Sequence, residues 1–226
     1  GGKMCVIIYK PEGMVIEKET VRNYWVVNND GAGYGIYDNK NLFFRKGIMS
    51  LKELEEEIDK LNKKHRKSRI VLHLRAVSKG KECKEMTHPF SLTPRQNTSL
   101  EGISKNPLLF HNGTITSLGD NEKSDTYQLA ELLGKIWNKT KDKDLIKDCL
   151  KILNQRFVVM YTDGDILLIN MIKDDDGCYY SIQRNLFRSY YYNTYNIWQG
   201  NTYWNKNNNY DNELFGGRRR KNDKFE

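Results

Sequence analysis

The sequence predicts an α+β fold in which antiparallel sheets are covered by helices. Two hairpin patterns predict the sheets: alternating residues flank a turn in "YGIYDNKNLFFRK" at 34–46, and "RFVVMYTDGDILLINMI" at 156–172 surrounds an Asp-Gly turn pair. Apolar residues recur at helical spacing between these hairpins, at 50–65 and at 124–153. Hairpin strands pair antiparallel, and helices grouped between them must cover the outer faces of the sheets.

Four further segments, short and apolar, predict the remaining strands. They are "CVIIYK" at 5–10, "RIVLHLRAV" at 69–77, "LLFHNGTI" at 108–115 and "CYYSIQR" at 178–184.

Serine caps predict where two of the helices begin. Ser50 is a good N-cap, and Glu53 completes a capping box with it. Ser124 caps the next helix, and a third helix is predicted at 144–153. The apolar face of the first helix consists of Leu51, Leu54, Ile58 and Leu61.

The chain divides into one predicted domain and two flanking pieces. Residues 1–4 are interpreted as a tag remnant or a propeptide, 5–188 as a domain long enough to bury a core, and 189–226 as an Asn/Tyr-rich basic tail.

The net charge of the chain is +8. From Cys178 onward there are eight Lys and Arg residues and four Asp and Glu residues. Half of the excess positive charge therefore lies in residues 178–226, so a nucleic-acid contact is expected at most through the tail. The aromatic tail either packs on the domain or docks a partner.

Composition disfavours several other classes of protein. The longest apolar runs, such as "DILLINMI", are too short to cross a bilayer, and no secretory signal pattern is present. Four cysteines are widely spaced and make no CxxC pair, namely Cys5, Cys83, Cys149 and Cys178. This spacing predicts neither a metal site nor a disulfide framework. We therefore expect a cytoplasmic protein with reduced thiols, no cofactor and no membrane contact.

Polar residues stand where the predicted strands and helices begin or end. They are Arg75 and Ser78 after one strand, Asn112 and Gly113 in another, and Asp125 in the first turn of a helix. A planar guanidinium can bind both oxygens of a carboxylate, and an Asn amide beside a glycine N–H can bind an oxyanion. An arginine and an aspartate together could hold the two charged groups of an amino acid. Each residue alone has an ordinary structural interpretation as a turn or a helix cap.

These pieces also follow one another in an order that resembles a known family. From Cys5 to about Arg184 the chain resembles the class II glutamine amidotransferases, which are N-terminal-nucleophile hydrolases. The matching pieces are Met-Cys at the start, "DGAGYGIYD", "HLRAVSKG", "THPF", "HNG" and "SDT". The resemblance implies a four-layer αββα sandwich, with two antiparallel sheets between helical layers.

The resemblance also implies a role for each site residue. Cys5 would attack the side-chain amide of glutamine, forming a γ-glutamyl thioester and releasing ammonia, with its own α-amino group as the base. Asn112 and Gly113 match the oxyanion hole. The implied substrate-binding residues are Arg75 for the α-carboxylate, Asp125 for the α-ammonium group, Ser78 where the family usually has Thr, and His88 in a nearby loop.

The start of the chain leaves alternatives open. With four residues before it, Cys5 has an amide nitrogen, which cannot act as a base. Residues 1–4 could be removed during maturation, the chain could cleave itself, or the site could be inactive. We expect an amidotransferase that delivers ammonia to an acceptor on a separate protein partner. The alternatives are a catalytically blocked binding or structural protein and a hydrolase for another amide, which would need neither Arg75 nor Asp125.

The remaining histidines and glycines of these motifs have structural interpretations. His73 and His111 lie inside apolar strands and are expected to be satisfied core residues. Gly31, Gly33 and Gly35 are not part of a βαβ unit and do not make a dinucleotide fingerprint. They are interpreted as a tight loop beside the active site.

Overall fold

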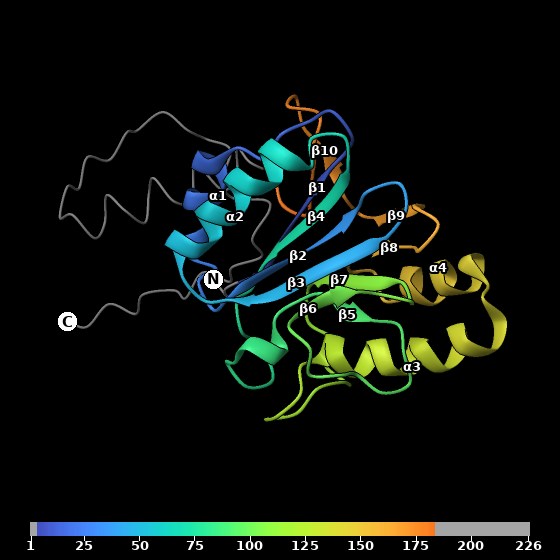
Figure 1. Ribbon diagram of the computed structural model, residues 1–226. Helices are drawn as coiled ribbons and strands as arrows, with labels where there is room; N and C mark the ends of the chain where they lie inside the picture. Colours follow the sequence, from blue (N-terminus) through green and yellow to red (C-terminus); the bar gives the residue numbers. More distant parts are fainter. Residues whose placement is uncertain (1–3, 184–226) are drawn as a thin grey trace, which may run out of the picture. The chain divides into compact units, whose positions relative to one another are not determined.

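The computed structural model describes residues 4–183, which form an α+β fold with two antiparallel sheets (Figure 1). The first sheet has seven strands in the order β10-β11-β1-β4-β2-β3-β6, and the second has four in the order β5-β7-β8-β9. The predicted α+β class with antiparallel sheets is therefore confirmed. The predicted tail at 189–226 lies outside the described residues.

The strands are short, and their bounds are as follows. The seven-stranded sheet consists of β1 (Val6–Lys10), β2 (Ala32–Tyr37), β3 (Leu42–Ile48), β4 (Arg69–Leu74), β6 (Glu101–Ile103), β10 (Ile172–Lys173) and β11 (Tyr179–Tyr180). The four-stranded sheet consists of β5 (Phe90–Ser91), β7 (Leu108–Asn112), β8 (Arg156–Met160) and β9 (Ile166–Ile169). The helices are α1 (Lys18–Trp25), α2 (Leu51–Lys64), α3 (Asp125–Thr140), α4 (Lys143–Ile152) and a single 3-10 turn, η1 (Lys84–Met86).

Both predicted hairpins are confirmed by the strand pairing. β2 pairs with β3 up to Tyr37 opposite Leu42, and Asn39 in the turn has a positive φ of 71°. β8 pairs with β9 up to Met160 opposite Ile166, and Gly164 in that turn has a φ of 92°. Asn and Gly tolerate this left-handed backbone better than other residues, which is why the turn pairs marked the hairpins correctly.

The predicted helix starts are also confirmed. The Ser50 hydroxyl accepts a hydrogen bond from the Glu53 amide at 3.3 Å, and α2 buries Leu54, Ile58 and Leu61. The Ser124 hydroxyl accepts from the amide of Tyr127 at 3.1 Å at the start of α3. Each cap satisfies an amide that has no partner within its helix.

Helix α1 and the short strands β5, β6 and β10 were not predicted, whereas the two-residue strand β11 lies within the strand predicted at 178–184. Helix α1 follows Glu17, whose side chain does not cap the helix, and it has only eight residues. It forms because Val21, Tyr24 and Trp25 are buried against the seven-stranded sheet. Strands of two or three residues are too short to show an alternating pattern, so only tertiary contacts define them.

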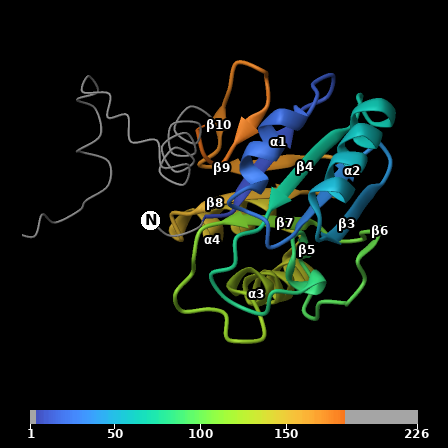
Figure 2. The same cartoon turned by 90° about the vertical axis from the view of Figure 1, so that its left-hand side faces the viewer.

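Three apolar clusters show what covers each face of the sheets. Helices α1 and α2 pack on the seven-stranded sheet in one cluster, and α3 and α4 pack on the four-stranded sheet in another. Figures 1 and 2 accordingly show α1 and α2 across the strands from α3. The third cluster contains residues of both sheets, including Val71 of β4 and Phe110 of β7. Along β1, Val6 and Ile8 belong to the first cluster and Ile7 to the third, so this strand is buried on both faces.

The interpretation of the glycine-rich segment as a tight loop is wrong for two of its three glycines. Gly33 and Gly35 lie within β2, and only Gly31 precedes that strand. A Cβ on Gly33 would lie 2.1 Å from the carbonyl oxygen of His88. Glycine is needed there because the backbone of residue 88 approaches β2 too closely for any side chain.

Candidate functional site

Cys5 stands directly before β1, beside the end of β4. Because Val6 is paired with Leu74, the residues just after β4 lie alongside Cys5. The Cys5 Sγ donates to the carbonyl oxygen of Ala76 and accepts from its amide, both at 3.3 Å. Within residues 4–183 no ionisable side chain forms a hydrogen bond with this thiol.

The Cys5 thiol is held in its protonated form. Burial around the sulfur raises its pKa to about 11, and the Ala76 hydrogen bond and the Arg75 charge only partly oppose this. Asp125 and Asp30 raise the same pKa, which places both carboxylates in the electrostatic neighbourhood of the sulfur. At neutral pH the thiol would therefore need a base before it could act as a nucleophile.

Arg75 supplies a buried positive charge beside the thiol. The side chain is 3% exposed, and its guanidinium donates to the carbonyl oxygens of Lys81 at 2.9 Å and Lys79 at 3.2 Å. Among residues 4–183 it has no carboxylate within ion-pair distance. A buried charge without a counterion is costly, so this guanidinium is suited to receiving an anionic group from a ligand.

Asp30 fixes the backbone around Arg75 and was not predicted. Its carboxylate accepts from the amide of Val77 at 2.7 Å, and its own amide donates to the Arg75 carbonyl at 3.2 Å. The Arg75 amide in turn donates to the Gly31 carbonyl at 2.8 Å. The sequence offered a signal in "DGAGYGIYD", where Asp30 directly precedes the glycines, but only the glycines were interpreted.

Asn112 is the last residue of β7, and Gly113 directly follows the strand. Asn112 is fully buried, its Nδ2 donates to the Ser181 hydroxyl at 2.9 Å, and its Oδ1 has no partner within the described part of the chain. Gly113 has a φ of 153°, and a Cβ there would lie 2.0 Å from Oε1 of Gln155. The positive φ favours glycine at this position.

Ser181 links Asn112 to the strand that follows Cys5, and sequence reasoning missed this role. Its hydroxyl accepts from the Ile7 amide at 2.8 Å as well as from Asn112, and its own amide donates to the Ile7 carbonyl at 3.0 Å. Ser181 is fully buried. A single serine in the middle of "CYYSIQR" carries no sequence signal for such a link, because the contact joins residues distant in the chain.

Asp125 joins the start of α3 to the loop that follows β7. One carboxylate oxygen accepts from the amide of Ile115 at 2.7 Å, and the other accepts from the amide of Thr126 at 2.7 Å. The side chain is 5% exposed. The oxygen that Thr126 contacts also accepts from the Thr126 hydroxyl at 3.2 Å, so the oxygen bonded to Ile115 is the one that can still accept from a cationic group.

Ser78 and Lys79 connect the loop after β4 to the same segment. Ser78 is exposed, and its hydroxyl accepts from that of Thr114 at 3.3 Å. The Lys79 ammonium donates to the carbonyl oxygens of Thr116 at 2.7 Å and Leu118 at 2.6 Å. The loops after β4 and β7 are therefore held together around the residues predicted to bind substrate.

His88 lies in the interior and not on the surface of the site. It is 4% exposed, and its Nδ1 is 3.1 Å from Nδ1 of His73. His73 Nε2 is 3.1 Å from the His111 carbonyl oxygen, and His111 Nδ1 is 2.8 Å from the Thr126 hydroxyl. Burial lowers the pKa of all three histidines, with values of about 3 for His73 and about 4 for His111, so all are neutral at pH 7.

His73 and His111 were expected to be buried core residues with all their polar atoms hydrogen-bonded. His73 and His111 are buried as expected, but Nε2 of His111 has no partner within residues 4–183, so that ring is only partly satisfied. The network ends at Asp125, which accepts from the Thr126 hydroxyl at 3.2 Å. His88 therefore stands behind the site and supplies no hydrogen bond to Cys5.

No family model and no curated protein matches this chain. The function is therefore inferred from the arrangement of the residues around Cys5. Among residues 4–183, no group of three or more His, Cys, Asp and Glu side chains could hold a metal ion, and no helix in this range could cross a membrane.

Proposed function

We propose that this chain is a class II glutamine amidotransferase domain that hydrolyses glutamine with Cys5 as the nucleophile. The observation that carries the proposal is the buried guanidinium of Arg75, which has no ion pair in the described chain and lies beside the Cys5 thiol. A zwitterionic amino acid brings the carboxylate that this guanidinium lacks. Asp125, whose charge acts on the same sulfur, would bind the α-ammonium group.

The proposed architecture is a four-layer αββα sandwich. The apolar clusters support it, because helices pack on one face of each sheet and residues of both sheets share the third cluster. In this arrangement Cys5, Arg75 and Asn112 all stand at strand ends, where loops can form a site without interrupting the core.

The α-amino group of Cys5 is the proposed base, and residues 1–4 are removed to free it. The thiol has a raised pKa and the Ala76 peptide as its partner, while the three buried histidines belong to a separate network. A terminal amine has a pKa of about 8, so a fraction is unprotonated at neutral pH. Met4, the residue directly before Cys5, is 50% exposed.

The reaction then follows from these groups. The amine takes the proton from Sγ, and the sulfur attacks the carbonyl carbon of the glutamine side chain. Nδ2 of Asn112 and the amide of Gly113 stabilise the oxyanion of the tetrahedral intermediate. The carbon–nitrogen bond breaks, ammonia leaves with the proton carried by the amine, and a γ-glutamyl thioester remains. Water, deprotonated by the same amine, hydrolyses the thioester to glutamate and frees the thiol.

Ammonia is proposed to pass to an acceptor on a separate protein partner in the cytoplasm. The tail at 189–226, which lies outside the described residues, stays the candidate docking segment. No cofactor is needed for the chemistry proposed here.

The test compares ammonia release from glutamine by two forms of the chain, one beginning at Cys5 and one that retains residues 1–4. General base catalysis contributes about 10²- to 10⁴-fold, so the form beginning at Cys5 should be faster by a factor in that range. Mass spectrometry of both samples verifies their first residue. Equal rates would contradict the α-amino base. Glutamine binding without ammonia release from either form would favour the blocked binding protein.

Replacing Ser181 with alanine should lower kcat about tenfold and leave KM for glutamine nearly unchanged. The change removes two hydrogen bonds, one that orients Asn112 and one from the Ile7 amide, each worth about 1 kcal/mol or somewhat more when buried. Steady-state kinetics on the chain beginning at Cys5 measure the split between kcat and KM. Ser68→Ala, a buried serine at the opposite end of β4, is the matched control. A parallel loss in both variants, or a change in KM alone, would contradict the positioning role.

A further inference from the structure

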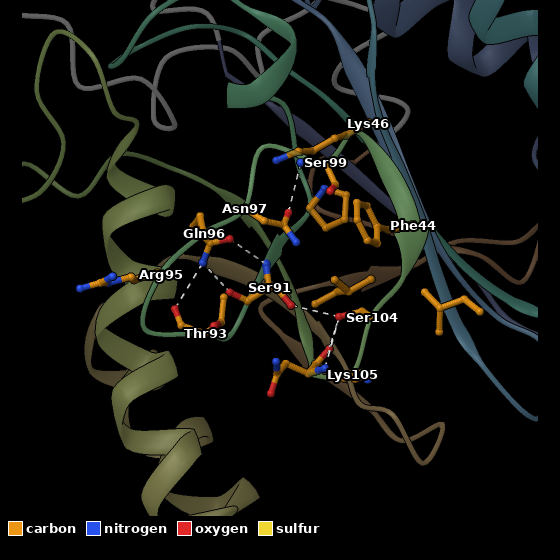
Figure 3. A pocket seen from close by; sticks show the side chains of 14 residues that line it. Phe44, Lys46, Ser91, Thr93, Arg95, Gln96, Asn97, Ser99, Ser104 and Lys105 are labelled. Atoms are coloured by element: carbon orange, nitrogen blue, oxygen red, sulfur yellow. Dashed lines mark hydrogen bonds between the residues drawn. The ribbon is translucent and has the colours of Figure 1, made fainter.

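A cavity lies away from the thiol, at the opposite end of β7 from Asn112. It has a volume of about 270 Å³ and is lined by residues of β3, β5 and β6, the 93–99 loop and the start of β7 (Figure 3). Leu108 contributes to its wall, and at about 3.4 Å per strand residue Asn112 is roughly 14 Å further along β7. The cavity is therefore separate from the proposed glutamine site.

The charge of this cavity is positive. Lys46, Arg95 and Lys105 line it, and none of its lining residues, all within the described range, is acidic. Figure 3 places Lys46 at one end and Lys105 at the other, with the polar side chains of Gln96 and Asn97 between them. Cationic and neutral hydrogen-bonding groups without any carboxylate are the lining expected for an anion.

Lys46 is the most unusual of these cations. It is 6% exposed, its ammonium donates to the Glu85 carbonyl at 2.9 Å and it lies 4.6 Å from the centre of the Phe90 ring. It forms no ion pair with any residue between 4 and 183. Burial lowers its pKa to about 8, so the amine is still mainly protonated at pH 7. A buried ammonium with unused donors gains from a ligand that supplies negative charge.

The polar wall is already ordered by internal hydrogen bonds. Gln96 Nε2 donates to the Ser91 carbonyl at 2.6 Å, and Gln96 Oε1 accepts from the Ser91 amide at 3.2 Å. The hydroxyls of Ser91 and Ser104 are 3.0 Å apart. A wall held in this way loses little conformational freedom when a ligand binds.

We propose that this cavity binds a small phosphate monoester. The lysines at the two ends match a ligand that carries more than one negative charge, which a phosphate group offers and a single carboxylate does not. At about 30 Å³ per water, the volume holds about nine water-sized groups, enough for a phosphate and a short carbon chain. Phe44 and Leu108 provide an apolar wall for that chain.

The test is isothermal titration calorimetry of the 1–226 chain with glycerol 3-phosphate, inorganic phosphate and succinate. We expect glycerol 3-phosphate to bind more tightly than succinate. Lys105→Glu, at an exposed position, should weaken this binding about tenfold or more, as expected for loss of a charge-assisted contact. The matched control is Lys135→Glu on α3, which makes the same charge change outside the cavity and should alter binding less than about twofold.

Three outcomes would overturn the proposal: no binding of either phosphate probe, equal binding of succinate, or equal weakening by both charge reversals. Lys46→Met provides a second variant, checked for folding by its thermal unfolding. If this variant folds and binds glycerol 3-phosphate as the parent does, the proposal is also wrong. None of these measurements involves glutamine, so the result is independent of the proposed amidotransferase activity.

Discussion

Replacing Cys5 with alanine, in the chain that begins at residue 5, should abolish ammonia release from glutamine. We expect a loss of about 10⁴-fold or more, since removal of a nucleophile leaves only binding and oxyanion stabilisation. Glutamine should still bind, because Arg75 and Asp125 supply the proposed contacts to its two charged groups. Coupled measurement of ammonia gives the rate, and calorimetry gives the affinity.

Cys149→Ala is the control for this variant. Cys149 is a partly buried thiol on α4 and packs against the cluster beneath the four-stranded sheet, away from the β1 end that carries Cys5. Its replacement should leave the rate within about twofold of the parent, as expected for a residue without a catalytic contact. Residual turnover by Cys5→Ala comparable to the parent would mean that another group attacks the amide.

Replacing Arg75 with lysine should raise KM for glutamine about 10- to 100-fold, with a smaller effect on kcat. Lysine keeps the positive charge but loses the planar fork, and a charge-assisted hydrogen bond is worth about 1.5–3 kcal/mol. Steady-state kinetics on the chain beginning at Cys5 measure this effect. Its physical origin is the buried guanidinium that only backbone carbonyls contact in the described chain.

A substrate without the α-carboxylate shows whether Arg75→Lys weakens the contact to that group or damages the site in general. The parent should use glutamine α-amide, which lacks the α-carboxylate, much less efficiently than glutamine, and Arg75→Lys should largely erase this preference. The matched control is Arg69→Lys at the start of β4, where Arg69 pairs with Glu12 on the surface. If Arg75→Lys kept the full preference for glutamine, the carboxylate would bind elsewhere.

Local sequence signals predicted most of the fold, because they act within a few residues. The Ser50 and Ser124 caps, the turns at Asn39 and Gly164 and the apolar strands all depend on neighbours in the chain. Helix α1 escaped prediction because its stability comes from burial against the sheet and not from a cap or a long periodic pattern. The glycines of β2 were misinterpreted for a related reason: the atom that excludes a side chain at Gly33 belongs to His88, far away in the sequence.

Residues of the candidate site could be singled out from the sequence only where they belong to a motif. Cys5, Arg75, Asn112 and Asp125 could be found from ordered motifs, and each stands at the end or start of a strand or helix. The groups that hold them in place could not be found this way. Asp30 and Ser181 contact the site through pairings between distant strands, which a single sequence does not reveal.

The claim that Cys5 is the glutamine-attacking nucleophile is tested most directly by covalent labelling. The chain beginning at Cys5 is treated with 6-diazo-5-oxonorleucine, an alkylating analogue of glutamine, and its peptides are mapped by mass spectrometry. We predict one adduct, on Cys5, that excess glutamine prevents, while the half-buried Cys83 and Cys149 stay unmodified as internal references. An unlabelled Cys5, or labelling of Cys83 or Cys149 to the same extent, would contradict the claim.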